Sequence, residues 1–285
     1  MVRSAAAANR SPADRPAVSA PAKDAPVPNL VLRLNESDDS ETTATTQPVM
    51  DRDAALRLLR ESEITAAELV PWGSNYTFGV ALTTASGREH LGIYKPKAGE
   101  APLHDFPGGT LYRREQASFL LSQRLGWDIV PPTVIRDGPH GVGSVQLYIE
   151  PSTELDGTTD YWMQPIQEIE RLVLFDHIAN NADRKIGHCL LDQTGKVWGI
   201  DHGLTFNHVP KLRTVLWQFI GQPVDPELLC DLQRLLEEEG GLRVELGEWL
   251  SNVELEALLR RVRAFVDEPV YPGLSPRRNV PYGWW

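Results

Sequence analysis

The chain has 285 residues, of which 41% are hydrophobic and 24% charged, and its formal net charge at pH 7 is −11. This length and apolar content suffice for one large core or a two-lobed one. The acidic balance argues against a dedicated surface for nucleic acid or anionic membrane, because those partners favour clustered Lys and Arg. With two cysteines and no transmembrane segment of roughly 18 to 20 apolar residues, we expect a cytoplasmic protein.

The first 48 residues are rich in Ala, Pro, Ser, Asp and Thr and contain few large apolar side chains. Such a segment cannot bury enough surface to offset its ordering entropy, so residues 1–48 are predicted to be a disordered leader. Apolar residues at Ala54, Leu58 and Leu59 then predict a short amphipathic helix, for which Asp51 is a suitable N-cap.

Two strands are predicted over residues 65–71 and 76–83, on either side of Trp72-Gly73-Ser74-Asn75. Gly73, Ser74 and Asn75 suit a hairpin tip whose backbone N–H groups face an anion. An ordinary hairpin turn is the alternative. The position of this tip, ahead of a strand that carries a lysine, favours a nucleotide-covering loop.

That lysine is Lys95, in a predicted strand over residues 91–96. A Gly- and Pro-rich connection leads from it to a helix over residues 111–125, which Gly126 ends. Glu115 falls on the apolar face of this helix, and a carboxylate there requires a partner. We expect Lys95 to be that partner, although a lone strand lysine can also face solvent. Lys97 competes for the role but follows Pro96 and so leaves the strand.

A second hairpin is predicted over residues 130–135 and 144–150. Its last residues, including Tyr148, are expected to connect two lobes and to offer backbone groups to adenine; a plain strand is an equally good interpretation. A helix that begins near Pro165 then leads into the most informative stretch of the chain, residues 176–206.

This stretch contains two acidic turns. The first acidic turn is Asn181-Ala182-Asp183-Arg184, and the second acidic turn is Ile200-Asp201-His202-Gly203. A short hairpin, with strands over residues 188–191 and 197–200 and a turn at 192–195, is expected to bring Asp183 and Asp201 to one site. Two carboxylates in one accessible cleft repel each other unless a divalent cation or a base role requires them.

At these residues the chain resembles the protein-kinase-like superfamily, within it the phosphatidylinositol 3-/4-kinase and HipA-like branch, and especially type II phosphatidylinositol 4-kinases. That branch has an N-x-D-R catalytic turn and an I-D-x-G-L-x-F metal loop, which match Asn181 to Arg184 and Ile200 to Phe206. One position departs from the pattern: the residue five after Asp183 is His188, where the branch has a metal-binding Asn.

The resemblance implies an α+β, two-lobed kinase-like fold, with an antiparallel sheet and one main helix in residues 49–150 and a mostly helical lobe in residues 151–268. It implies that Asp183 accepts the proton of an acceptor hydroxyl, that Lys95, oriented by Glu115, holds the ATP phosphates, and that Asp201 and His188 bind Mg²⁺. Because Mg²⁺ prefers oxygen ligands, a histidine at position 188 is also compatible with binding of Mn²⁺, with a site for a single metal ion, or with loss of catalytic activity. Lys185 either neutralises the migrating phosphoryl group or is a solvated surface lysine.

The favoured function is therefore an ATP-dependent kinase that phosphorylates a hydroxyl of an unidentified lipid, metabolite or protein. A catalytically silent nucleotide-binding pseudokinase or scaffold is the first alternative. A metal-dependent hydrolase is the second, and it is the less supported because no HxH or HExxH spacing occurs. It would use the residues His177, Asp183, His188, Asp201, His202 and His208.

The rest of the second lobe is predicted to be helical. Helices are expected over residues 213–220, 226–239 and 252–266, with Asp225 and Asn252 as N-caps. For the tail, residues 269–285, disorder and docking of its terminal aromatic residues both remain open.

Overall fold

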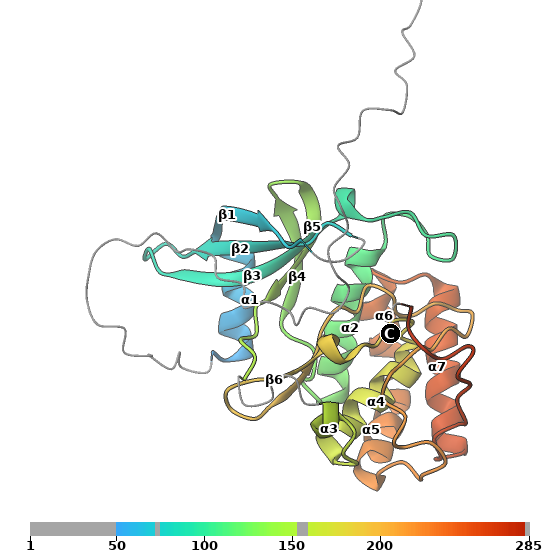
Figure 1. Cartoon of the computed structure of the whole chain (residues 1–285). Coiled ribbons are helices and arrows are strands. Elements are labelled where there is room, and N and C mark those ends of the chain that lie inside the picture. The colour runs from blue at the N-terminus through green and yellow to red at the C-terminus, as the bar shows by residue number, and fades with distance from the viewer. Residues whose placement is uncertain (1–49, 72–74, 153–158, 283–285) are drawn as a thin grey trace, which may run out of the picture.

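The computed structural model describes residues 50–71, 75–152 and 159–282. A five-stranded sheet with a helix against it forms one lobe, and most of the helices form the other (Figure 1). Helix α2 (Leu111–Leu125) lies between them and contacts strands of the sheet as well as helices of the second lobe. This two-lobed α+β arrangement confirms the predicted fold class. The predicted leader and the last three residues lie outside the described residues.

The sheet has the strand order β1-β2-β3-β5-β4, and all neighbouring strands are antiparallel. The strands are β1 (Glu63–Leu69), β2 (Phe78–Thr83), β3 (Glu89–Pro96), β4 (Thr133–Gly138) and β5 (Gly141–Leu147). Both predicted hairpins form, with strand bounds shifted by a few residues. Because β5 ends at Leu147, Tyr148 lies just beyond the strand.

Side-chain alternation along β3 sorts its residues between the core and the cleft. Tyr94 is fully buried in a cluster with Leu59 and Val145, whereas its neighbour Lys95 is only partly buried and lies on the opposite face. Helix α1 (Arg52–Glu61) packs against β4 and β5 through residues that include Leu59. Its N-cap is Asp51, whose carboxylate accepts the Ala54 N–H at 2.8 Å, as the sequence predicts.

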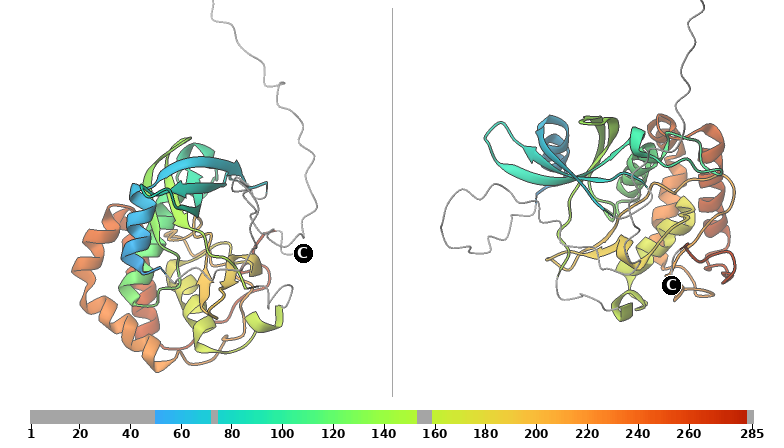
Figure 2. Two further views of the ribbon diagram at one scale, coloured as in Figure 1. Left: turned by 90° about the vertical axis from the view of Figure 1, so that its left-hand side faces the viewer. Right: turned by 45° about the horizontal axis from the view of Figure 1, so that its top comes forward.

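The second lobe contains α3 (Thr159–Trp162), α4 (Gln167–Ala179), α5 (Pro226–Glu237), α6 (Glu239–Gly247) and α7 (Asn252–Asp267). Figure 2 shows the longer of these helices gathered beside one another, away from the sheet. Helix α4 is buried along most of its length, with Leu172 and Phe175 fully inaccessible, because its neighbours cover it. The helix that leads into the first acidic turn is therefore held rigidly by the core.

A small hairpin separates the two acidic turns. Its strands are β6 (Cys189–Leu191) and β7 (Val197–Gly199), and a turn with Gly195 at φ +84° joins them. The short 3-10 helix η3 (Ile186–His188) connects the first acidic turn to β6. The backbone N–H of Gly199 donates to the Ile129 carbonyl at 2.7 Å, which ties β7 to the segment after α2.

The structure corrects three predictions in the second lobe. Residues 213–220 form no helix, because their backbone bonds to other segments: Arg213 N–H donates to the Asn181 carbonyl at 2.9 Å, and Thr214 N–H to the Asn279 carbonyl at 2.9 Å. The N-cap of α7 is Ser251 rather than Asn252, since Ser251 forms a capping box with Glu254. The helix expected over residues 226–239 ends at Glu237 and is followed by a separate helix, α6, which the sequence pattern does not predict.

The C-terminal segment, as far as the structure describes it, docks on the second lobe. Tyr271 is 1% exposed, and its backbone exchanges hydrogen bonds with Gly221 and Gln222, each at 3.0 Å. Asn279 receives Thr214 N–H and donates its side-chain amide to the Leu212 carbonyl at 2.7 Å. Residues 269–282 are therefore packed on this lobe, whereas the terminal aromatic residues whose docking the sequence left open lie outside the described residues.

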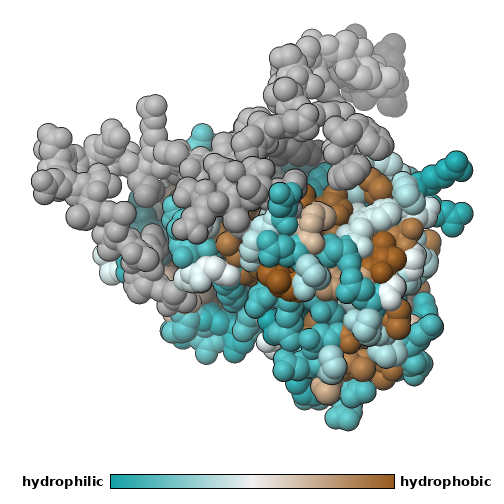
Figure 3. Space-filling model, turned by 60° about the horizontal axis from the view of Figure 1, so that its bottom comes forward, coloured by the Kyte–Doolittle hydropathy of each residue, from teal (hydrophilic) through white to brown (hydrophobic). Residues whose placement is uncertain are grey.

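On the face shown in Figure 3, hydrophilic residues predominate and hydrophobic ones occur in scattered patches. Within the part of the chain that the structure describes, none of the helices has both the length and the apolar character required to cross a bilayer.

Candidate active site

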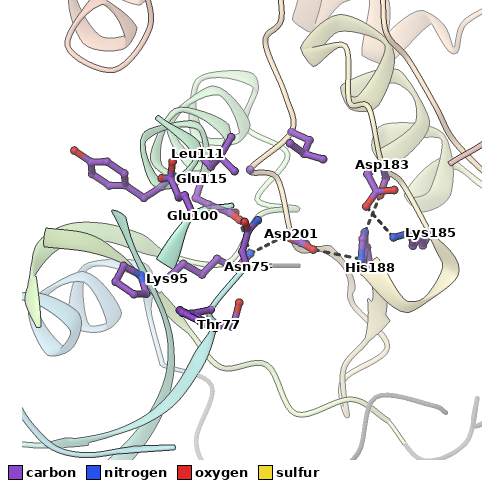
Figure 4. Close-up of a pocket in the computed structure, with 15 residues that line it drawn as sticks. Asn75, Thr77, Lys95, Glu100, Leu111, Glu115, Asp183, Lys185, His188 and Asp201 are labelled. Atoms are coloured by element: carbon purple, nitrogen blue, oxygen red, sulfur yellow. Dashed lines mark hydrogen bonds and ion pairs between the residues drawn. The ribbon is translucent and has the colours of Figure 1, made fainter. Parts of the chain in front are cut away.

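A cavity of about 180 Å³ lies between the sheet and the helical lobe (Figure 4). Seven of the residues predicted for the site line it, and they come from widely separated parts of the chain. These residues are Asn75, Lys95, Glu115, Asp183, Lys185, His188 and Asp201. The remaining lining residues are Tyr76, Thr77, Pro96, Glu100, Leu111, Tyr112, Gly203 and Leu204.

The other predicted site residues are Gly73, Ser74 and Tyr148. Gly73 and Ser74 lie outside the described residues. Tyr148 is described by the structure but does not line the cavity. Its backbone N–H donates to the Leu91 carbonyl at 3.2 Å. Of the residues named for the hydrolase alternative, His177 lies away from the cavity, because it packs edge-on against Phe265 and Tyr271 in the core of the helical lobe.

Lys95 bridges the two lobes. Its ammonium donates to Glu115 Oε1 on α2 and, at 2.7 Å, to Asp201 Oδ1 in the second acidic turn. The lysine side chain is 21% exposed, so it faces the cleft rather than open solvent. Burial alone would lower the pKa of Lys95, but the two carboxylates outweigh it and raise that pKa. Lys95 is therefore a fixed positive charge inside the cavity.

Glu115 is held from both sides. While Oε1 accepts from Lys95, Oε2 accepts the backbone N–H of His202 at 3.0 Å. Its side chain is only 3% exposed, so the buried carboxylate has the partners that its position on the inner face of α2 requires. The pairing of Lys95 with Glu115 that the sequence predicts is present, and it extends to the backbone of the second acidic turn.

The first acidic turn begins where α4 ends. Asn180 closes the helix with φ +54°, a left-handed conformation that Asn tolerates. Asn181 Oδ1 then accepts the Asp183 N–H at 3.0 Å, which fixes the aspartate at the tip of the turn. Lys185 Nζ donates to Asp183 Oδ2 at 2.9 Å. Burial raises the pKa of Asp183 despite the opposing charge of Lys185, and a carboxylate of raised basicity suits proton acceptance.

The second acidic turn presents Asp201 at φ +59°. A non-glycine residue rarely adopts this left-handed conformation, although Asp does so more readily than most, and such strain is frequent at functional sites. The Lys95 ammonium holds the pKa of Asp201 well below its usual range, against the effect of burial. Asp201 is thus ionised and half-exposed toward the cavity, with Oδ2 at 3.4 Å from His188 Nε2.

The His188 ring is oriented by the first acidic turn. Its Nδ1 lies 2.9 Å from the Asp183 carbonyl oxygen, which can only accept, so this nitrogen carries the proton. Burial lowers the pKa of His188, which favours the neutral ring. Nε2 then directs a lone pair toward the Asp201 carboxylate. A histidine whose one N–H is donated to a carbonyl, leaving the second ring nitrogen available to a cation, has the usual arrangement of a metal ligand.

Two side chains are not a complete metal site. Across residues 50–71, 75–152 and 159–282, no group of three or more His, Cys, Asp or Glu side chains is arranged to hold a metal ion. A Mg²⁺ ion on a nucleotide needs only one or two protein ligands, since phosphate oxygens and water complete its shell. The His188–Asp201 pair fits that role, and its imidazole nitrogen suits Mn²⁺ as well.

Glu100 is a charged cavity residue that the sequence did not reveal. It follows β3 in the connection to α2, where Oε1 accepts the Tyr112 N–H at 2.9 Å and so caps the helix. Its other oxygen, Oε2, is buried without a hydrogen-bond partner among the described residues. A glutamate in a Gly- and Pro-rich segment gives no sign of this position, which arises only when the connection folds against α2.

The chain is similar in sequence to proteins from a mycobacterium and from rice. No protein-family model matches the chain. The chain is 35% identical over 266 residues to Protein Rv2133c of Mycobacterium tuberculosis, covering 81% of this chain and 95% of that protein. It is 24% identical over 236 residues to Phosphatidylinositol 4-kinase gamma 4 of Oryza sativa subsp. japonica, covering 68% of this chain and 41% of that protein.

Among solved structures, that of hydra Fam20 with sugar superposes with a TM-score of 0.52 at 16% identity and covers 78% of this chain and 89% of that one. This likeness shows that the fold is protein-kinase-like, as the sequence predicts.

Proposed function

The chain belongs to the family of Mycobacterium tuberculosis Protein Rv2133c, and we propose that it transfers the γ-phosphate of ATP to a hydroxyl group. The observation that carries this proposal is the convergence of Lys95, Glu115, Asp183 and Asp201 on one cavity between two lobes. Phosphoryl transfer depends mainly on positioning and charge neutralisation, and this set supplies both.

In this proposal Lys95 binds the phosphates of ATP, and the Glu115 carboxylate keeps the Lys95 ammonium in the cleft. Asp201 and His188 would hold the Mg²⁺ or Mn²⁺ ion, which supplies positive charge to the phosphates. The enclosed volume of about 180 Å³ is below the ~300–1,000 Å³ of pockets that enclose a whole ligand. We therefore assign the cavity to the phosphates and the acceptor hydroxyl, and Asn75 to the loop that covers them.

Asp183 orients the acceptor and accepts its proton. The acceptor oxygen bonds to the γ-phosphorus as the bond to the β–γ bridging oxygen breaks, and ADP leaves. Lys185, which pairs with Asp183 at 2.9 Å, lies where it can also neutralise the migrating phosphoryl group. The Lys185 ammonium opposes the rise that burial causes in the pKa of Asp183, and so it favours the ionised carboxylate that accepts the proton.

We further propose that the chain falls in the phosphatidylinositol 3-/4-kinase and HipA-like branch of the fold. The sequences of the two acidic turns support this placement, and so does the similarity to a rice phosphatidylinositol 4-kinase. The acceptor is a hydroxyl of a lipid, a small metabolite or a protein side chain, since one fold serves many substrates.

A second candidate is a nucleotide-binding protein that does not transfer phosphate. His188 in place of the usual Asn, together with the direct pairing of Lys95 and Asp201, favours it. The two functions differ in one measurable way: a silent binder is stabilised by ATP and releases no ADP.

The experiment that tests transfer is ADP release by the purified full chain, with Mg²⁺ or Mn²⁺ and water as acceptor. Asp183→Asn should lower turnover by at least about 100-fold, the usual contribution of a general base, while ATP still raises the melting temperature. Asp267→Asn, at an exposed position at the end of α7, is the matched control. Equal turnover by wild type and Asp183→Asn contradicts the proposal.

A further inference from the structure

Arg184, the last residue of the first acidic turn, is completely buried. Its Nε and Nη2 donate to the two oxygens of Asp176 on α4, at 2.7 and 2.9 Å. Its Nη1 donates to the backbone carbonyls of His188 and Ile200, at 2.8 and 3.1 Å. One planar guanidinium is thus bound to the helix before the first acidic turn and to both segments that present the metal-binding side chains.

The same network fixes Asp183. Asn181 donates its side-chain amide to Asp176 Oδ1 at 2.8 Å and accepts the Asp183 N–H at 3.0 Å. Since Asp183 immediately precedes Arg184, its backbone is held on both sides by groups that share the Asp176 carboxylate. The separation between Asp183 and the His188–Asp201 pair therefore depends on the positions of the Arg184 and Asp176 side chains.

His202 connects this network to the sheet lobe. Its Nε2 lies 2.8 Å from Arg184 Nη2, and because a guanidinium only donates, the imidazole nitrogen accepts. The backbone N–H of His202 donates to Glu115 Oε2, and Glu115 Oε1 binds Lys95. An unbroken chain of hydrogen bonds thus runs from the strand lysine through His202 and Arg184 to the first acidic turn.

Stability alone does not explain this arrangement. A buried ion pair is often replaced by apolar residues without loss of stability, so its presence is weak evidence for a purely structural role. The surroundings also accommodate it closely: a Cβ on Gly199 would lie 2.6 Å from Leu172 Cδ1 and 3.3 Å from Arg184 Nη2. A larger residue here would crowd Leu172 most and the guanidinium less, so glycine at this position eases the packing of β7 beside the network.

We propose that Arg184 is a positioning residue that sets the spacing between Asp183 and the His188–Asp201 pair, and that His202 couples this spacing to the Lys95–Glu115 pair. This inference rests on the proposed function. It adds that the two lobes are linked through hydrogen bonds inside the site as well as through the nucleotide.

His202 offers the sharper test, because two substitutions separate hydrogen bonding from packing. His202→Gln places an amide oxygen near the position of Nε2 and keeps an acceptor for Arg184. His202→Leu removes the acceptor in a position that is fully buried. We expect His202→Leu to lower kcat by about 100-fold, as a displacement of about 1 Å can, with the KM for ATP nearly unchanged. His202→Gln should restore kcat to within about threefold of wild type.

Hydrogen exchange provides a second readout that needs no activity. The amides of Ala182 and Ile200 bond to Leu204 and His188 at 2.9 and 3.0 Å and so report on the two acidic turns. In His202→Leu these amides should exchange about tenfold faster, while those of α7 remain as in wild type. In His202→Gln both sets should match wild type.

The outcomes distinguish the two hypotheses. If wild type releases no ADP, the proposed phosphate transfer is refuted. Hydrogen exchange then tests, without any activity, whether His202 couples the two acidic turns to the Lys95–Glu115 pair. If wild type is active and His202→Leu keeps its kcat, or if exchange at Ala182 and Ile200 is unchanged, the positioning role is refuted. A uniform increase of exchange that includes α7 also refutes it, because that result indicates general destabilisation.

Discussion

His188 and Asp201 face each other across 3.4 Å with a ring nitrogen and a carboxylate oxygen, while the second ring nitrogen of His188 donates to the Asp183 carbonyl. Two lone pairs at this separation are stabilised by a shared cation. The imidazole of His188, five residues after Asp183, is thus oriented by the first acidic turn.

This pairing predicts a change in metal preference. His188→Asn replaces the nitrogen ligand with an amide oxygen, so the ratio of Mg²⁺-supported to Mn²⁺-supported ATP binding should rise. His188→Leu should weaken binding with either metal by about 10-fold to 100-fold. Calorimetric titration of ATP with each metal checks both. Unchanged metal dependence in His188→Leu contradicts the assignment of His188 as a ligand.

Lys95→Met should lower ATP affinity and the melting temperature together. The substitution leaves the buried Glu115 carboxylate without its cation, which costs about 3–5 kcal/mol when a buried pair is broken. Glu115→Gln should be milder, because the amide oxygen still accepts His202 N–H. Lys97→Met is the matched control, since Lys97 is exposed and lies outside the cavity. Equal losses in Lys95→Met and Lys97→Met would refute the distinction between the two lysines.

His177 makes the stability of the helical lobe depend on pH. Burial lowers the pKa of His177 to about 4 in the folded chain, against about 6.5 when unfolded. Between these values the unfolded chain binds a proton that the fold excludes, so the free energy of unfolding falls as pH decreases from about 6.5 to 4, by about 3 kcal/mol.

His177→Leu should flatten this dependence, and the exposed His104→Gln should not. Urea unfolding measured at pH 7 and pH 4.5 checks the difference between the variants. Parallel pH profiles for wild type and His177→Leu contradict the prediction.

The docked C-terminal segment should contribute to stability through Tyr271. Tyr271→Ala removes a side chain that packs on Phe219 and Phe265, and it should lower the free energy of unfolding by about 3–5 kcal/mol. Tyr271→Phe removes only the hydrogen bond to Glu170 Oε1 at 3.1 Å and should cost about 1 kcal/mol. Val270→Ala, 41% exposed, should change stability by less than about 0.5 kcal/mol. Similar effects of Val270→Ala and Tyr271→Ala in urea unfolding would show that the segment is not docked in solution.

Sequence patterns correctly predicted the helices and helix caps that depend on interactions between residues close together in the chain. Helix α2 has the predicted bounds because its apolar spacing is regular and Gly126 ends it at φ +73°. The Asp51 and Asp225 caps also form as expected, since each carboxylate bonds an N–H two or three residues ahead. The hairpin turn at residues 192–195 also predicted that Asp183 and Asp201 reach one site, and both line the same cavity.

The errors arose where distant segments decide the local structure. Residues 213–220 have a helical pattern, but their backbone groups pair with the first acidic turn and with Asn279. Helix α6 was missed because Gly240 and Gly241, which usually mark a helix end, lie within it. Glu100 and the partners of Arg184 depend on contacts between residues far apart in the chain, and no local pattern encodes them.

The most direct test of the central claim is calorimetric binding of ATP to wild type and to Asp201→Ala, each with Mg²⁺, with Mn²⁺ and without metal. Metal should strengthen ATP binding to wild type by about tenfold or more and should leave binding to Asp201→Ala unchanged. Equal affinities of wild type and Asp201→Ala for ATP in the presence of metal would contradict it.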